Sequence, residues 1–144
     1  MGPLLISVYD HEKGVPVASF LTSDWMADLT TALNGHAGFK TAIANVDLTL
    51  QFVVSDAPAG TEGRYYIDVA DAKALAAPGD AAEPDATITN NYETAVALSK
   101  GETNTQMAFM TGKIKVTGNM AKLMMNQAML NQFALAAAGV NVTY

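Results

Sequence analysis

Residues 106–129 read QMAFMTGKIKVTGNMAKLMMNQAM, and they hold six of the chain's eight methionines. The methionines lie on both sides of residues 113–117, a short segment in which lysine alternates with apolar residues. This alternation predicts a strand with Ile114 and Val116 facing inward. Methionine is long and flexible, so it suits surfaces that adapt to different ligands, whereas a core needs no such concentration of it. The stretch therefore favours a deformable apolar wall, with an ordinary core as the alternative.

The patterns on either side of this stretch predict an α+β domain. Apolar residues at helical spacing predict helices at about residues 23–33, 36–45, 91–100, 105–110 and 119–138. Alternating patterns predict strands at residues 46–54, 64–70, 85–89 and 113–117. The first two strands are expected to form an antiparallel hairpin. Residues 71–84 are interpreted as a short helix or an irregular loop, and residues 1–22 as an edge hairpin or an N-terminal arm. This order predicts a small, mainly antiparallel sheet with helices on one face.

The length of 144 residues predicts a single domain over residues 1–144, with its core at about 23–138. The chain has no cysteine, which excludes a disulfide framework and a thiolate nucleophile. No run of residues approaches the roughly 18 consecutive apolar positions of a membrane span. The N-terminal residues lack the basic flank and the length of a signal peptide. We therefore expect a soluble protein of the cytoplasm.

The charge balance limits the classes of partner. The chain carries 14 acidic and 8 basic residues, for a net charge of −6. Nucleic acid demands clustered lysine and arginine, so it is not an expected partner. The same balance argues against electrostatic docking on anionic lipid, and leaves open only a transient contact with a membrane.

Catalytic chemistry has little support in the sequence. His11 and His36 are the only histidines, and neither lies in a spacing that recruits a metal or a nucleophile. No metalloprotease, hydrolase, phosphate-loop or dinucleotide motif is present. Asp68 and Asp71 lie three residues apart at a predicted strand end, where a loop or capping role is favoured over acid–base work. We predict no catalytic residue, no metal site and no cofactor.

The final predicted helix is apolar on most sides. Met120, Leu123 and Met124 define one stripe, and from residue 128 to residue 138 only Asn131 and Gln132 are polar. A helix that is apolar all round must be buried, lie against a partner, or cover an apolar cavity. The residues alone leave these alternatives open.

Residues 101–120, GETNTQMAFMTGKIKVTGNM, resemble the signature of the sterol carrier protein 2 family. Its members show a helix ending in glycine, an Ala-Phe-Met-like turn, a strand in which lysines alternate with apolar residues, and Gly-Asn/Asp-Met at the start of the last helix. Residues 63–68 and 85–88 resemble two earlier strands of the family, and Leu98–Gly101 its Leu-x-x-Gly helix end. Order and spacing agree over about residues 46–125. The compact single domain and the C-terminal residues 141–144, which are not the family's Ser-Lys-Leu address, suggest a bacterial-type, stand-alone member.

The resemblance implies a five-stranded sheet with helices covering one face and enclosing an apolar tunnel. Because the residues alone predict four strands, the fifth is expected at Leu4–Tyr9 or near Leu75. Carried over by position, the tunnel wall comprises Leu48, Leu50, Phe52, Ile67, Met107, Phe109, Met110, Ile114, Val116, Met120, Leu123, Met124, Leu130 and Phe133.

The expected function is that of a non-catalytic intracellular lipid carrier. The resemblance implies fatty acid, acyl-CoA, phospholipid or sterol-like ligands held in the tunnel. Two alternatives are kept: a lipid-binding accessory subunit of a membrane-lipid or quinone pathway, and a homodimerising structural domain with a closed pocket. Either a monomer or a homodimer is compatible with the sequence. The C-terminal residues do not form the Ser-Lys-Leu peroxisomal address.

Overall fold

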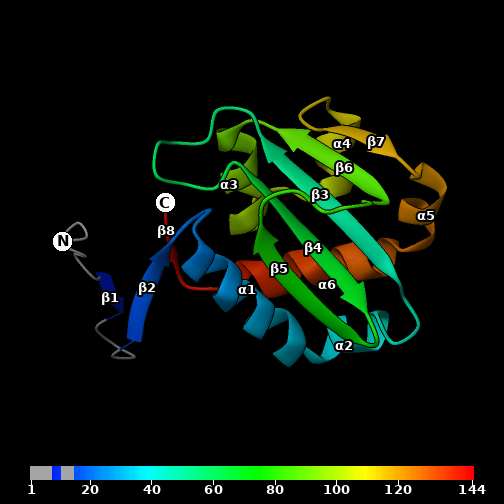
Figure 1. The fold of residues 1–144 in the computed structure, drawn as a ribbon, viewed down its shortest axis with the longest axis horizontal. Coiled ribbons are helices and arrows are strands. Elements are labelled where there is room, and N and C mark those ends of the chain that lie inside the picture. The colour runs from blue at the N-terminus through cyan, green and yellow to red at the C-terminus, as the bar shows by residue number, and fades with distance from the viewer. Residues whose placement is uncertain (1–7, 11–14) are drawn as a thin grey trace.

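The computed structural model describes residues 8–10 and 15–144. Its main sheet has five strands in the order β5-β4-β3-β6-β7 (Figure 1). The strands are β3 (Leu48–Val54), β4 (Arg64–Ala70), β5 (Lys73–Pro78), β6 (Ala86–Asn90) and β7 (Lys115–Gly118). The pair β3 and β6 is parallel and the other three pairs are antiparallel. The predicted α+β class with a mainly antiparallel sheet is confirmed.

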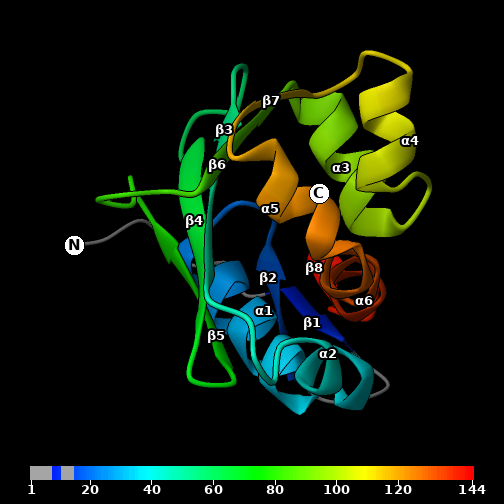
Figure 2. The ribbon, with the colours of Figure 1, turned by 90° about the vertical axis from the view of Figure 1, so that its right-hand side faces the viewer.

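The helices lie on one face of this sheet, which Figure 2 shows from its side. They are α1 (Ser23–Gly35), α2 (Ala37–Ala42), α3 (Tyr92–Lys100), α4 (Thr105–Met110), α5 (Met120–Met125) and α6 (Gln127–Ala138). Helix α6 packs against α1, α2 and α3, while α1 packs along β5. Among the described residues, no helix combines the length and the apolar character needed to cross a bilayer.

The fifth strand is β5, which contains Leu75. The interpretation of residues 71–84 as a short helix or irregular loop is therefore wrong for residues 73–78. Asp71 and Ala72 both have positive φ, at 53° and 58°, and form the two-residue turn between the paired residues Ala70 and Lys73. Such turns are usually marked by Asn-Gly or Asp-Gly, and alanine is depleted in strands. The Asp-Ala turn and the Ala-rich strand explain why this hairpin has no clear sequence signal.

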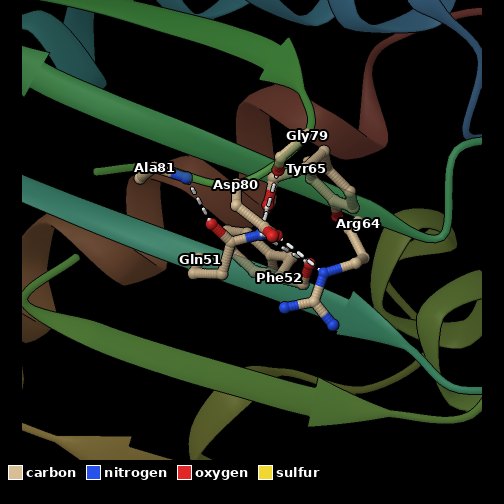
Figure 3. Close-up of polar contacts among 7 residues, drawn as sticks. All are labelled: Gln51, Phe52, Arg64, Tyr65, Gly79, Asp80 and Ala81. Atoms are coloured by element: carbon tan, nitrogen blue, oxygen red, sulfur yellow. Dashed lines mark hydrogen bonds and ion pairs between the residues drawn. The ribbon is translucent and has the colours of Figure 1, made fainter. Parts of the chain in front are cut away.

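The outer face of the sheet is not exposed to solvent along its whole length. The alternation in β3 places Gln51 on the solvent side, yet this residue is only 3% exposed. Its Nε2 donates to the carbonyl oxygens of Tyr65 and Gly79, both at 3.1 Å, and its Oε1 accepts from Ala81 N–H at 2.7 Å (Figure 3). Nε2 also lies 3.3 Å from the Asp80 carboxylate, which Arg64 contacts. The side chain of Gln51 thus holds the chain that follows β5 against the sheet.

Both ends of the described chain meet in a second sheet. Strand β1 (Val8–Asp10) pairs antiparallel with β2 (Val15–Ser19), and β2 pairs parallel with β8 (Val142–Thr143). The edge-hairpin alternative for the N-terminal residues is confirmed for these two strands. Residues 1–7 and 11–14, which include most of Leu4–Tyr9 and all of the expected turn, lie outside the described residues.

The last predicted helix is two helices. Helix α5 ends at Met125 and α6 begins at Gln127, with Asn126 at φ −115° and ψ 31° between them. The Asn126 side chain donates to the Lys122 carbonyl oxygen at 2.8 Å. Asparagine competes with the helical backbone for hydrogen bonds in this way, which favours a break over a continuous helix. The break gives α5 and α6 different directions (Figure 1).

Side chains cap the starts of two of these helices. The Thr22 side chain accepts from Trp25 N–H at 3.3 Å at the start of α1. The Asn104 side chain accepts from Met107 N–H at 2.8 Å at the start of α4. Threonine and asparagine are both favoured at this position, because their side-chain oxygen satisfies a backbone N–H that has no partner within the helix.

Candidate functional site: two adjoining apolar cavities

A cavity that is partly open to solvent lies between the inner face of the sheet and helices α3 and α6, and its empty space, counted together with the adjoining solvent at its mouth, is about 650 Å³. We call it the inner cavity. The described residues that line it include no charged residue, and they are Phe20, Trp25, Leu50, Phe52, Tyr65, Ile88, Asn90, Ala95, Leu98, Ser99, Thr105, Leu130, Phe133, Ala134 and Ala137.

Helical spacing explains which side chains reach this cavity. Helix α6 contributes residues 130, 133, 134 and 137, which follow the i, i+3, i+4, i+7 pattern of a single helical face. Helix α3 contributes residues 95, 98 and 99, and is held in place by Asn91 at its start and Gly101 at its end. Three of these positions are alanine. A small side chain where a helix faces a sheet leaves space that larger residues would fill.

Aromatic side chains form one continuous wall of the inner cavity. Phe52 stacks on Tyr65 with ring centroids 4.9 Å apart, and on its other neighbour Phe133 at 6.3 Å. Trp25 meets the ring of Tyr65 edge-on at 5.6 Å and that of Phe20 at 4.8 Å. Such rings give a large apolar contact area with little conformational entropy to lose.

One lining residue has a buried polar atom without a partner among the described residues. The indole Nε1 of buried Trp25 makes no hydrogen bond within the described residues. An unsatisfied buried donor is costly, so a ligand that presents an acceptor there would gain a hydrogen bond. Burial also raises the pKa of the Tyr65 hydroxyl, which therefore stays neutral at physiological pH. These polar groups of the inner cavity are thus uncharged.

A second cavity, also partly open, lies among α4, β7, α5 and the start of α6, and its empty space together with the adjoining solvent is about 590 Å³. We call it the outer cavity. Its lining comprises Thr105, Gln106, Phe109, Val116, Met120, Leu123, Met124, Gln127, Leu130 and Asn131. Thr105 and Leu130 line both cavities, so the two adjoin. Phe109, Met120 and Met124 are also exposed to solvent, which places them at the rim.

Nine of the fourteen predicted wall residues line these cavities. Leu50, Phe52, Leu130 and Phe133 line the inner cavity. Phe109, Val116, Met120, Leu123 and Met124, together with Leu130, line the outer one.

The structure places the other five predicted residues elsewhere. Leu48 and Ile67 are buried in the main core, and Ile114 is buried in a small cluster with Ile88 and Ala108. Met107 and Met110 are exposed on α4. The part of these five residues in ligand binding stays a prediction.

Several lining residues were not predicted from the sequence. Tyr65 had an available signal, because it alternates with Ile67 and Val69 on the apolar side of its strand. Trp25 lies in the apolar stripe of α1, a pattern that does not separate core residues from cavity residues. Phe20 directly follows β2, and its N–H donates to the Thr143 carbonyl oxygen of β8 at 2.8 Å, a contact between distant parts of the chain that no local pattern predicts.

The histidine that the structure describes has a structural role. His36 Nδ1 accepts from Phe39 N–H at 3.0 Å and caps α2. His11 lies outside the described residues. In the part of the chain that the structure describes, no three acidic or histidine side chains gather as a metal site would require.

An uncharged apolar space between a sheet and its helices is the kind of site that proteins use for apolar small molecules. The family model described as the SCP-2 sterol transfer family matches residues 22–131. The chain therefore belongs to the SCP-2 sterol transfer family, and the resemblance in residues 101–120 is confirmed.

Named relatives agree with this assignment. Human sterol carrier protein 2 is 40% identical over 73 residues, which make up 51% of this chain but 13% of the human protein. The solution structure of sterol carrier protein domain 2 of Helicoverpa armigera is 30% identical, covers 84% of this chain and 91% of its own, and has a TM-score of 0.60. A crystal structure of sterol carrier protein 2 shares the fold with a TM-score of 0.70 at 20% identity, over 85% of this chain and 99% of that one.

Proposed function

We propose that the protein binds and carries a lipid whose apolar part occupies the inner and outer cavities as one tunnel. The observation that carries this proposal is the shared lining at Thr105 and Leu130, which joins two uncharged apolar spaces. Burying a sixteen-carbon chain yields about 12 kcal/mol at ~0.8 kcal/mol per CH₂. Association and ordering cost on the order of 4–15 kcal/mol, so shape alone can supply useful affinity.

The charge of the lining bears on the ligand class. In the part of the chain that the structure describes, no cationic side chain lines either cavity, and burying an ionised group without a partner is strongly unfavourable. A fatty acid, acyl-CoA or phospholipid would therefore enter tail first and keep its ionised headgroup at the open rim. A sterol-like ligand would bring an uncharged hydroxyl, which can accept from the Trp25 indole N–H. The inner cavity thus favours an apolar tail or a neutral polar end.

The lining residues supply contact area and not acid–base groups, which supports a carrier and not an enzyme. We place this carrier inside the cell, in the cytoplasm, and expect it to work without a cofactor. Flexible methionines at positions 120 and 124 line the outer cavity, where they can repack around ligands of different shape.

The test is native mass spectrometry of the freshly purified full chain, paired with its denatured mass and a lipid extraction. Adducts with the mass of a fatty acid, sterol or phospholipid that disappear on denaturation support the carrier and identify its cargo. A clean unliganded mass, followed by no uptake of added oleate, cholesterol or phospholipid, overturns the proposal.

A further inference from the structure

The charge of the chain is unevenly distributed. All 14 acidic residues lie in residues 1–102, together with five of the eight basic residues. Residues 103–144 hold three lysines, at positions 113, 115 and 122, and no acidic residue. The net charge of −6 therefore divides into −9 for the first part and +3 for the second. The net charge of the whole chain therefore gives no indication of this basic segment.

The same segment carries most of the exposed apolar side chains. Nine large apolar residues in the described chain are exposed, and six of them lie in residues 107–125. These six are Met107, Phe109, Met110, Met120, Met124 and Met125. Met110 is 73% exposed and Met125 is 84% exposed. Large exposed side chains that gather in one region mark an interaction surface, whereas scattered ones need no explanation.

The fold brings these residues to one end of the molecule. Helix α4, strand β7 and helix α5 lie together at the opposite end from α1 and α2 (Figure 1). They surround the rim of the outer cavity, since Phe109, Val116 and Met120 all line it. We call residues 105–125 the α4–α5 end. Of its lysines, Lys122 pairs with Asp85 at 3.0 Å, while Lys113 and Lys115 are in no ion pair with a described residue.

We propose that the α4–α5 end docks on the surface of an anionic lipid bilayer. The methionines and Phe109 would enter the boundary between headgroups and acyl chains, and Lys113 and Lys115 would lie beside lipid phosphates. Charge complementarity selects this occupant over an apolar protein partner, because the exposed basic groups lie in the same segment as the exposed apolar ones. Helix α1 is excluded as the docking element, because its only charged residues are Asp24 and Asp28.

Docking at this end opens the outer cavity toward the bilayer. The rim residues Met120 and Met124 belong both to the cavity lining and to the exposed apolar group. A ligand would therefore pass between bilayer and cavity without crossing water. The docking surface itself does not depend on which lipid the cavities take.

The experiment is sedimentation of the full chain with phosphatidylcholine vesicles, with and without phosphatidylglycerol. One variant, Lys113→Gln with Lys115→Gln, removes the basic groups, and a second, Met125→Ser, removes the most exposed of the apolar side chains, which lies outside both cavity linings. The matched control is Lys73→Gln with Leu75→Ser on β5, an exposed lysine and an exposed leucine at the opposite edge of the sheet.

We expect the unmodified chain to bind the anionic vesicles and to bind neutral ones far less. The double lysine variant should bind about 30-fold more weakly, since each lysine near an anionic surface contributes about fivefold. The methionine variant should also bind more weakly, and the control should match the unmodified chain. Equal binding to both vesicle types, no binding to either, or an equal loss in the control would overturn the proposal.

Ligand uptake separates this proposal from the carrier function. The fluorescence of Trp25, the chain's single tryptophan, reports on the inner cavity. Both docking variants should keep the response of the unmodified chain to added oleate. A chain that docks on vesicles but never responds to a ligand would contradict the carrier function and leave docking supported.

Discussion

Phe52 of β3 stacks on Tyr65 of β4 with ring planes only 6° apart and centroids 4.9 Å apart. The two residues are register partners in neighbouring strands, so the sheet itself sets this contact. Phe133 of α6 lies near-parallel to Phe52, at 11°, across the space between helix and sheet. The stacked pair is therefore a rigid floor for the inner cavity, and α6 supplies the facing wall. The space available to a ligand therefore depends on the distance between α6 and these stacked rings.

Leu130 is the residue at which a larger side chain should separate the two cavities, because it lines both. We expect Leu130→Trp to block the passage and reduce uptake of long-chain lipid at least tenfold, while short chains still bind one cavity. The matched control is Leu135→Trp, on the same helix but 61% exposed. Titration with fatty acids of increasing length measures the effect. Equal affinity of Leu130→Trp and the control for long chains would contradict a continuous tunnel.

Removal of the Trp25 indole N–H should weaken the binding of ligands that carry a hydrogen-bond acceptor more than the binding of purely apolar ligands. Trp25→Phe keeps an aromatic ring but loses the unpaired donor, so a ligand that accepts there should lose about 0.5–1.5 kcal/mol of binding free energy. A ligand without an acceptor should lose less. Calorimetric titration with a long-chain alcohol and with an alkane of equal length compares the two. An equal loss for both would mean that the N–H does not meet the ligand.

Asp85 should make the free energy of unfolding depend on pH in the acidic range. Partial burial alone raises the pKa of this carboxyl, but hydrogen bonds from Thr49 N–H and from Lys122, together with the Lys122 charge, lower it below its usual value. A carboxyl with a lowered pKa stabilises the folded state above its unfolded pKa of about 3.9, and this contribution is lost as pH falls toward the folded pKa. Urea unfolding at neutral pH and near pH 3 should show a smaller difference for Asp85→Asn than for the unmodified chain.

The same residue ties α5 to the sheet. Its carboxylate contacts Lys122 at 3.0 Å, and its carbonyl oxygen accepts from Asn119 N–H at 2.8 Å. We therefore expect faster amide hydrogen exchange in α5 of Asp85→Asn at neutral pH, with no change in β4. Unchanged exchange in α5 would show that the backbone contact is sufficient to hold the helix.

Gly118 should tolerate no side chain. Its φ is +105°, and a Cβ there would lie 2.5 Å from the Asp85 carbonyl oxygen and 2.8 Å from Ala86 Cα, both of which are backbone atoms. Gly118→Ala should cost about 2 kcal/mol or more of unfolding free energy. Gly112→Ala is the matched control, because φ is +74° there and a Cβ meets nothing within 4 Å. The control should lose only about 1 kcal/mol, and equal losses in thermal unfolding would contradict the steric argument.

Strongly periodic segments were predictable from the sequence. The alternation in residues 64–70 matches β4 at both ends, and the helix predicted at about residues 91–100 matches α3. Two elements were not predictable in this way. Strand β5 is Ala-rich and follows an unusual turn, and the break at Asn126 interrupts a segment whose apolar residues suit one long helix. In β5, pairing with β4 overrides a weak local preference, whereas at Asn126 a side-chain hydrogen bond to the Lys122 carbonyl oxygen favours the break.

The cavity lining shows more clearly what the periodicity of apolar residues cannot predict. Leu48 and Leu50 share one face of β3, and both are buried. Only Leu50 lines a cavity, while Leu48 is enclosed by the core. Nothing local distinguishes them, because both obey the same alternation. Their difference depends on which helix lies over each of them, and the distance between helix and sheet is a non-local property.

The sequence by itself therefore determined the α+β class, most of the elements and, through residues 101–120, the family. Periodicity and caps act over a few residues, so a single chain records them directly. The tertiary structure alone decided that one face of α6 lies over the stacked rings of Phe52 and Tyr65, and that Phe20, Trp25 and α3 line the same cavity. These are consequences of packing between elements distant in sequence, and no short stretch of residues contains them.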